Sequence, residues 1–133
     1  MRNAKMIEEI NNAIGAHGMW KLRLRTAVST GRSEMTAKVA GCSDQCTFGK
    51  WLASSQLDAS VRAGVPYKVV SRVHAEFHQC AGKVLTHVER GDTGSARDLL
   101  EGEYFERTDK LIRALMKWKG ELLRDTAIAR FAA

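Results

Sequence analysis

Four side chains in this sequence could bind one metal ion together: His17, Cys46, His74 and His78. His74 and His78 are four residues apart, so in a helix both imidazoles project from the same side, one turn apart, and can converge on one ion. A His-x-x-x-His pair alone is weak evidence, because a surface pair or two hydrogen-bonded core histidines would give the same spacing. The metal interpretation therefore needs ligands from other parts of the chain.

His17 and Cys46 supply these further candidates. His17 lies on the apolar stripe of a different predicted helix, and internal metal sites of helical bundles are assembled from facing helices. Ser43 is expected to cap a short helix with Cys46 in its first turn, where the helix dipole favours the metal-binding thiolate. Three imidazole nitrogens and one sulfur suit tetrahedral zinc, so the sequence predicts a Zn²⁺ site at these four residues.

Hydrophobic periodicity predicts the elements that position these ligands. Helices are expected over about residues 5–29, 44–55, 66–91 and 95–129. The stretches 31–41 and 56–65 are expected to be loops, and Ser95 with Asp98 resembles a capping box that opens the last helix. The sequence shows no alternating strand pattern. We therefore expect an all-α fold, an antiparallel four-helix bundle in which one short helix carries the cysteine ligand.

Length and composition limit the broad class of protein. The chain has 133 residues, of which 44% are hydrophobic and 27% charged. This is enough for one well-cored domain and too little for two ordinary ones, so residues 1–133 are expected to form a single domain. Acidic residues occur where a signal peptide would be apolar, and no apolar run is long enough to span a membrane. We expect a soluble cytoplasmic protein whose three cysteines do not form a disulfide framework.

A net charge of +6 raises the question of nucleic acid or an anionic membrane as a partner. The basic residues are spread along the whole chain, and the densest patch, Lys21, Arg23 and Arg25, has no interleaved aromatic residue on which bases could stack. Solvated helix faces explain such a pattern. We therefore expect neither a nucleic-acid nor a membrane partner, and a basic nucleic-acid-binding bundle is the less favoured alternative.

Three segments of the sequence resemble the signature segments of a known family in order and spacing. They are His17-Gly18-Met19-Trp20-Lys21, Cys46-Thr47-Phe48-Gly49-Lys50-Trp51-Leu52 and His74-Ala75-Glu76-Phe77-His78. The family is the chemoreceptor zinc-binding domain, and the resemblance covers about residues 5 to 125. It implies zinc coordination by the histidine of the first segment, the cysteine of the second and both histidines of the third. These are the four residues that the spacing had already selected.

The resemblance also implies a function in bacterial signalling. Members of this family are similar helical bundles, often dimeric, attached to chemotaxis receptors or diguanylate cyclases, and zinc occupancy or oxidation of the cysteine by agents such as hypochlorous acid changes their output. From its sequence we expect this chain to carry neither a receptor signalling hairpin nor a cyclase domain. We therefore expect a regulatory sensor of zinc or oxidants that passes its signal in trans to a signalling protein. The alternative is a zinc-storage or structural zinc protein without a switch.

An enzymatic function is not expected. Four protein ligands close a tetrahedral zinc and leave no position for a catalytic water. Glu76 is two residues from each of the paired histidines and lies on the other side of the helix, unlike the glutamate of a zinc protease. A di-iron site of the hemerythrin kind needs five histidines, and the chain has four.

Other residues near the predicted site have two possible roles. Cys42 could form a disulfide with an oxidised Cys46 or be a spectator thiol, whereas Cys80 lies on an apolar stripe and is expected to be a buried thiol. Trp20 and Trp51 could wall the metal site or simply pack in the core.

Two further expectations concern movement and assembly. The glycine-containing connector of residues 31–41 and the short helix with Cys46 are expected to form a movable element. The long last helix is expected to keep an apolar edge, including Trp118, for a dimer. His87 lies off the face of the paired histidines and is expected to be exposed.

Overall fold

The computed structural model describes the backbone of residues 2–132 and the side chains of residues 3–127. Within this range the chain is all-helical, as predicted, and no strand occurs. The helices, in chain order, are α1 (Arg2–Thr30), α2 (Ala37–Ala40), the 3-10 helix η1 (Ser43–Gln45), α3 (Thr47–Leu52), α4 (Ala59–Ala63), α5 (Val65–Glu89), α6 (Thr93–Glu101) and α7 (Glu103–Ala132).

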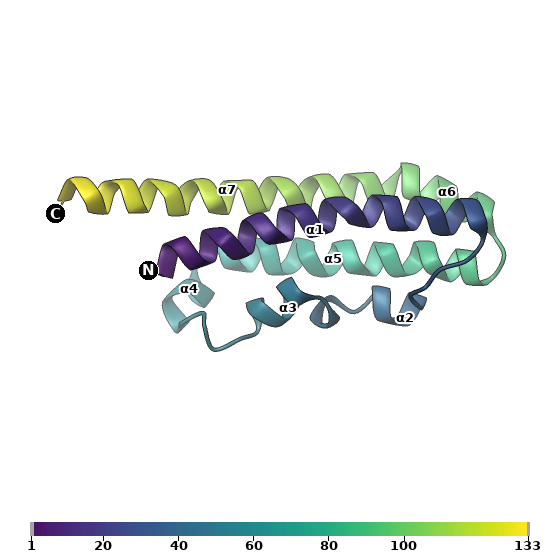
Figure 1. Cartoon of the computed structure of the whole chain (residues 1–133), viewed down its shortest axis with the longest axis horizontal. Coiled ribbons are helices and arrows are strands. Elements are labelled where there is room, and N and C mark those ends of the chain that lie inside the picture. Colours follow the sequence, from purple (N-terminus) through teal and green to yellow (C-terminus); the bar gives the residue numbers. More distant parts are fainter. Residues whose placement is uncertain (1, 133) are drawn as a thin grey trace.

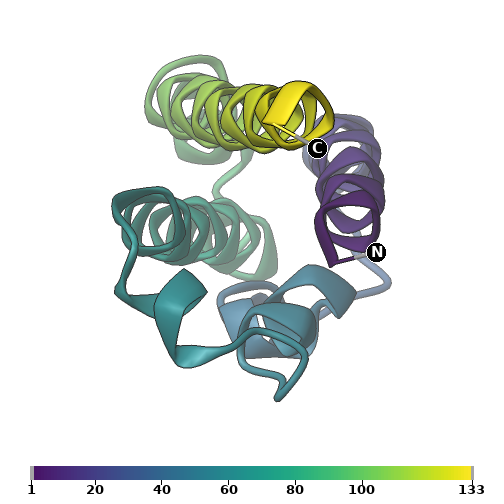
Figure 2. The ribbon, with the colours of Figure 1, turned by 90° about the vertical axis from the view of Figure 1, so that its left-hand side faces the viewer.

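Three long helices and one broken segment form the four sides of a bundle. α1 and α5 run in the same direction, while α7 and the segment of residues 31–64 run back along them (Figure 1). Viewed from the end, α1, α5 and α7 occupy three corners and the 31–64 segment occupies the fourth (Figure 2). Neighbouring sides are therefore antiparallel, which confirms the predicted bundle and replaces its short helix by several short pieces. Among the residues described, no helix has the length and apolar character needed to cross a lipid bilayer.

α1 presents one buried stripe to the bundle, as the periodicity predicts. Ile10 and Leu24 are fully buried, and Ile7 and Ile14 are half-buried against the same core. His17 lies on this stripe and is 1% exposed. The spacing of apolar residues along the helix therefore carries a polar ring into the interior.

α5 begins and ends where its sequence indicates. Pro66 lies in its first turn, where the missing N–H leaves no hydrogen bond unmade. Its buried stripe includes Val73, Phe77 and Val84. Gly91 follows the helix with a φ of 77°, a conformation that residues with a side chain rarely adopt. The 25 residues of α5 thus form one uninterrupted helix, with the paired histidines near its middle.

The predicted last helix is wrong at its start and in its continuity. The Asp92 side chain, not Ser95, caps α6 by accepting a hydrogen bond from the Ser95 N–H at 3.0 Å. At Gly102 the chain leaves helical geometry, with a ψ of −96°, and α7 begins at the next residue. The predicted pattern ran across this break because the buried stripe continues from Leu100 to Tyr104 on both sides of it.

The 31–64 segment departs furthest from the prediction. A single helix over 44–55 is wrong, because η1 and α3 are separated by Cys46, and both predicted loops contain a helical turn, α2 and α4. α2 is capped by Thr36, and the Glu89 carboxylate of α5 accepts a hydrogen bond from its Ala37 N–H at 2.7 Å. Further along, the Tyr67 hydroxyl donates to the Leu52 carbonyl at 2.8 Å. Contacts with α5 therefore hold the short pieces against the bundle.

The prediction that Trp118 lies on an exposed edge of the last helix, available for a dimer, is wrong. This side chain is 4% exposed, and its ring packs within the chain, 6.0 Å from that of Trp51 and 6.4 Å from that of Tyr67. Trp118 belongs to the buried stripe of α7 because α3 and the start of α5 cover it. A surface for a second copy would have to use other residues.

Candidate metal centre

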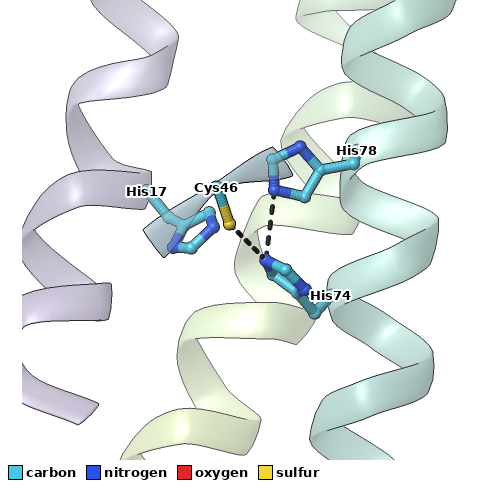
Figure 3. A group of neighbouring side chains, drawn as sticks. All are labelled: His17, Cys46, His74 and His78. Carbon is cyan, nitrogen blue, oxygen red and sulfur yellow. Dashed lines mark hydrogen bonds between the residues drawn. The ribbon is translucent and has the colours of Figure 1, made fainter. Parts of the chain in front are cut away.

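The structure brings the four predicted ligand residues to one point in the bundle. His17 comes from α1, His74 and His78 come from α5, and Cys46 lies between η1 and α3, with all four side chains directed inward (Figure 3). One potential ligand atom from each lies within 4.8 Å of the other three. The three histidines are each 1% exposed.

The distances between these atoms suit a tetrahedral zinc ion. The Cys46 Sγ is 3.2 Å from the His74 Nε2, and that atom is 3.1 Å from the His78 Nε2. Zinc–nitrogen bonds of about 2.0–2.1 Å and a zinc–sulfur bond of about 2.3 Å separate tetrahedral ligands by about 3.3–3.7 Å. These two pairs would need to move apart by only a few tenths of an ångström, and the remaining ligand atoms lie within 4.8 Å.

Backbone carbonyls fix the outer nitrogens of two of the rings. The His17 Nδ1 lies 2.8 Å from the Ala13 carbonyl, and the His78 Nδ1 lies 3.0 Å from the Ala40 carbonyl. A carbonyl can only accept, so each Nδ1 carries the proton and each Nε2 presents a lone pair to the centre. This arrangement is common for zinc-binding histidines, because it fixes both the tautomer and the orientation of the ring.

The His17 Nε2 lone pair has no hydrogen-bond partner among the residues whose side chains are described, although the atom is buried. Leaving a buried polar atom unpaired costs about 1–3 kcal/mol. A cation at the centre would satisfy this atom together with the Nε2 of His78. The unpaired nitrogen is therefore the observation that most directly indicates a metal.

Cys46 occupies the N-cap position of α3 and does not lie within a helical turn. It is itself the N-cap of α3, and its sulfur accepts a hydrogen bond from the Gly49 N–H at 3.3 Å, so the predicted cap by Ser43 is wrong. Gly49 permits this turn because the Ser43 carbonyl oxygen lies 1.8 Å from the position that a Cβ would occupy there. Any larger residue would displace the turn that carries the sulfur.

The ionisation of the site follows from its burial. Burial lowers the pKa of His17 to about 4 and that of His74 to about 3, and it also lowers the pKa of His78. These rings are therefore neutral near pH 7, as metal ligands must be. Burial raises the pKa of the Cys46 thiol above that of a free cysteine, although hydrogen bonds from the surrounding N–H groups act in the opposite direction. The predicted preference for thiolate is therefore wrong for the protein groups alone, because burial outweighs the helix start.

Aromatic rings form the wall around the imidazoles. The rings of Phe48 and Phe77 lie edge-on to His17, at 6.0 Å and 5.1 Å between centroids. The Trp20 ring lies 5.4 Å from that of His78, which confirms one predicted wall residue. The Trp51 ring packs against that of Phe48, with 5.6 Å between centroids. Sequence reasoning missed Phe48 and Phe77 as wall residues, although both lie in the quoted segments.

A cleft of about 680 Å³ reaches this site from the surface. It runs between α1 and the α2–α3 stretch, and its lining includes exposed Met19 and Leu22 as well as buried His17 and His78. Cys46 also lines it. The three imidazoles are thus buried, whereas Cys46 is partly exposed and lines the cleft together with His17 and His78.

The other candidate residues lie outside the cluster. Cys80 is 2% exposed, as predicted, and burial raises its pKa to about 11. Cys42 lines the same cleft as Cys46, and its thiol donates to the Lys38 carbonyl at 3.1 Å. His87 is partly exposed and lies 4.0 Å from Asp92, away from the site.

Comparison with known proteins agrees with this geometry. The family model described as the chemoreceptor zinc-binding domain matches residues 17–85, just over half of the chain and less than the predicted 5–125. The match begins at His17 and includes Cys46, His74 and His78. No curated protein and no solved structure matches the chain significantly.

Proposed function

We propose that this chain, because it belongs to the chemoreceptor zinc-binding domain family, holds one zinc ion through His17, Cys46, His74 and His78 and uses it to sense zinc or oxidants. The observation that carries the zinc site is the convergence of three neutral imidazoles and one sulfur, with the His17 Nε2 buried and unpaired. Four protein ligands leave no open position for a substrate, which favours a regulatory role over hydrolysis.

Access to the sulfur supports the oxidant part of this proposal. Bound zinc would hold the Cys46 sulfur as a thiolate at neutral pH and keep it nucleophilic. The cleft between α1 and the α2–α3 stretch leads to this sulfur. With an oxidant of the hypochlorous acid class, the sulfur loses two electrons and becomes a sulfenic acid, while chloride leaves. A sulfenic acid is a poorer ligand, so one of the four bonds to the metal would weaken.

The element that responds, in this proposal, is the stretch of residues 31–52. Its sulfur ligand is Cys46, and its Ala40 carbonyl holds the His78 ring at 3.0 Å. Its attachment to α5 includes the 2.7 Å bond from the Ala37 N–H to the Glu89 carboxylate. Loss of the metal would remove one attachment and loosen a second, so this stretch should open more easily than the long helices.

Output to a partner completes the proposed sensor. The family resemblance implies a chemoreceptor or a diguanylate cyclase as the signalling partner and a homodimer as the working form. Because Cys46 belongs to the 31–52 stretch, a change at the site would reach a partner through the surface of this stretch. The closed, buried donor set also fits a storage or structural zinc protein. A measurement of partner binding before and after zinc removal distinguishes the two functions, because only a sensor should change its binding.

Zinc content of purified variants tests the site. We expect one zinc per chain in the wild type, and loss of most of it when His17, Cys46, His74 or His78 is replaced by alanine. His87→Ala and Cys80→Ala are matched controls, because each removes the same side-chain type away from the cluster, and both should keep the metal. Full zinc content in His17→Ala would contradict the proposed ligand set.

Hydrogen exchange tests the switch separately. Metal removal, and Cys46→Ala, should speed amide exchange in residues 31–52 by at least about tenfold relative to α5. If zinc content falls and exchange in this stretch is unchanged, the site binds metal without a switch, and the storage or structural function is the better account.

A further inference from the structure

A groove runs along the outer side of the bundle between α5 and α7. Two adjoining hollows of about 500 Å³ and 90 Å³ share Val69 and Ala114, so together they form one groove. Its lining lies within residues 65–76 of α5 and 107–121 of α7. The α5–α7 groove is therefore about 16–21 Å long. None of the elements described covers this side of the two helices (Figure 2).

The floor of the α5–α7 groove is apolar. Val73 is 6% exposed and Trp118 is 4% exposed, while Val69 and Ala114 are half-buried. Val65, at one end of the groove, is 72% exposed, more than any other large hydrophobic side chain that the structure describes. Such an apolar strip between two helices is a surface on which the apolar stripe of another helix can pack.

Basic side chains flank this floor. The lining contains two acidic residues, Glu76 and Glu121, and five basic residues. The basic residues, one from α5 and four from α7, are Arg72, Arg107, Lys110, Arg113 and Lys117. The α5–α7 groove therefore carries a net positive charge, which favours an acidic partner.

Three of these cations have no ion-pair partner among the residues described. Arg107 lies 3.6 Å from Glu76, and Arg113 lies 3.0 Å from Asp109. The other three basic residues of the lining are exposed and make no ion pair with any side chain that the structure describes. They can therefore pair with the carboxylates of a partner without first losing an ion pair of this chain.

The shape and chemistry of the groove distinguish between kinds of acidic partner. Within a helix the backbone N–H and C=O groups bond to one another, so α5 and α7 offer no hydrogen bonds to an extended strand. Nucleic-acid bases would need an exposed aromatic ring on which to stack, and the Trp118 ring in the lining is 4% exposed. A flat membrane surface would not reach the apolar floor. An amphipathic helix fits both features, because it places an apolar stripe between two rows of polar side chains.

We propose that the α5–α7 groove binds an acidic amphipathic helix of a partner protein. The apolar stripe of this helix covers Val65, Val69 and Ala114, and its carboxylates pair with Arg72 and Lys110. The lining includes neither the four proposed zinc ligands nor any residue of the 31–52 stretch. The proposal therefore goes beyond the sensing of zinc or oxidants and can be tested without reference to it.

Fluorescence anisotropy with a designed peptide and the full chain tests the groove. The probe is a labelled peptide of about 14 residues, about 21 Å long as a helix, with leucines on one face and glutamates elsewhere. A chemical staple keeps it helical, because so short a peptide is otherwise marginally stable as a helix. We expect a dissociation constant of about 10–100 µM at low salt. A scrambled peptide with the same charge and no apolar face should bind at least about tenfold more weakly. Absence of binding, or equal binding of the scrambled peptide, would overturn the proposal.

Charge reversal in the chain locates the binding site. Arg72→Glu combined with Lys110→Glu should weaken peptide binding by at least about tenfold, because two attractions become repulsions. Lys21→Glu combined with Arg25→Glu is the matched control, since it makes the same charge change at exposed residues of α1. This control should bind the peptide within about threefold of wild type. Equal losses in the two double variants would mean that net charge alone attracts the peptide, and the groove would be excluded as the site.

Measurements on the same samples distinguish other occupants of the groove. Duplex DNA with the same net charge as the peptide should bind the wild type more weakly than the peptide does. Tighter DNA binding that is lost in the groove variant would replace the acidic helix by nucleic acid. The groove variant should keep the oligomeric state of the wild type in sedimentation velocity, and a change would mean that a second copy occupies the groove. Circular dichroism and zinc content should be unchanged, so failure of the groove is distinguishable from failure of the zinc site.

Discussion

Zinc affinity should depend on pH through one proton, and that proton comes from Cys46. Burial lowers the pKa of His17 to about 4 and of His74 to about 3, and lowers that of His78 as well, so the rings carry no proton to displace above about pH 6.5. Burial raises the pKa of the Cys46 thiol above that of a free cysteine, so this thiol must lose its proton when the metal binds. Each zinc bound should therefore release one proton.

The release of one proton per zinc sets how steeply the zinc dissociation constant depends on pH. Between about pH 6.5 and 8, the dissociation constant should rise tenfold for each unit by which the pH is lowered, which is about 1.4 kcal/mol per unit. Competition with a zinc indicator in non-coordinating buffers measures this slope. In Cys46→Ala the affinity should be lower and nearly independent of pH over the same range.

Two results would refute this reasoning. A slope near zero in the wild type would mean that Cys46 is already a thiolate, so that the turn before α3 outweighs its burial. A slope of two or more would mean that histidines are protonated near neutral pH before zinc binds. The pH dependence thus reports the balance between burial and hydrogen bonding at the site.

Three other perturbations have clear expected outcomes. With zinc removed by a chelator, the free energy of unfolding should fall as the pH is lowered from about 6.5 towards 4, by up to about 1.4 kcal/mol per pH unit for each buried histidine. The reason is that histidines of the unfolded chain bind protons in this range, whereas the buried rings of the folded chain do not. Urea titrations at several pH values measure this dependence, and a flat profile would contradict the burial of the rings. Gly49→Ala should lower zinc content and thermal stability, because a Cβ would lie 1.8 Å from the Ser43 carbonyl oxygen. Gly15→Ala is the control and should leave zinc content intact, since a Cβ there would have nothing within 4 Å. Equal zinc content and stability in the two variants would show that the turn at Cys46 can adjust freely. Trp118→Ala should destabilise the fold by about 3–5 kcal/mol, because it removes a buried ring, and a loss below about 1 kcal/mol in chemical denaturation would place this ring outside the core.

The three histidines could be found from sequence because long helices impose a regular geometry. Apolar residues on α1 and α5 recur at the helical period, so the inward faces of both helices are fixed by local pattern. His17 lies on one such face, and His74 with His78 lies on another. Two facing helices with inward histidines leave few arrangements besides a shared site.

The position of Cys46 in its turn could not be found in the same way. The pieces α2, η1 and α3 are too short to be stable from their own residues, and they are held by contacts with distant parts of the chain. The Glu89 carboxylate that binds the start of α2 lies 52 residues away in sequence. Periodicity does not record such contacts, so the sequence predicted one helix where the structure has an interruption.

The wrong prediction that Cys46 prefers the thiolate form has a similar origin. The predicted thiolate at Cys46 considered only the start of a helix, which is local in sequence. Desolvation depends on the rings that other helices bring to the site, including Phe77 and the three histidines. Gly102 shows the same limit, because the buried stripe runs through the break between α6 and α7 without recording it.

X-ray absorption at the zinc edge of the purified protein tests the central claim most directly. The account predicts one sulfur at about 2.3 Å and three nitrogens at about 2.0–2.1 Å, with the sulfur shell absent in Cys46→Ala and unchanged in Cys42→Ala and Cys80→Ala. Two sulfurs around the metal, or a first shell of nitrogen and oxygen alone in the wild type, would contradict it.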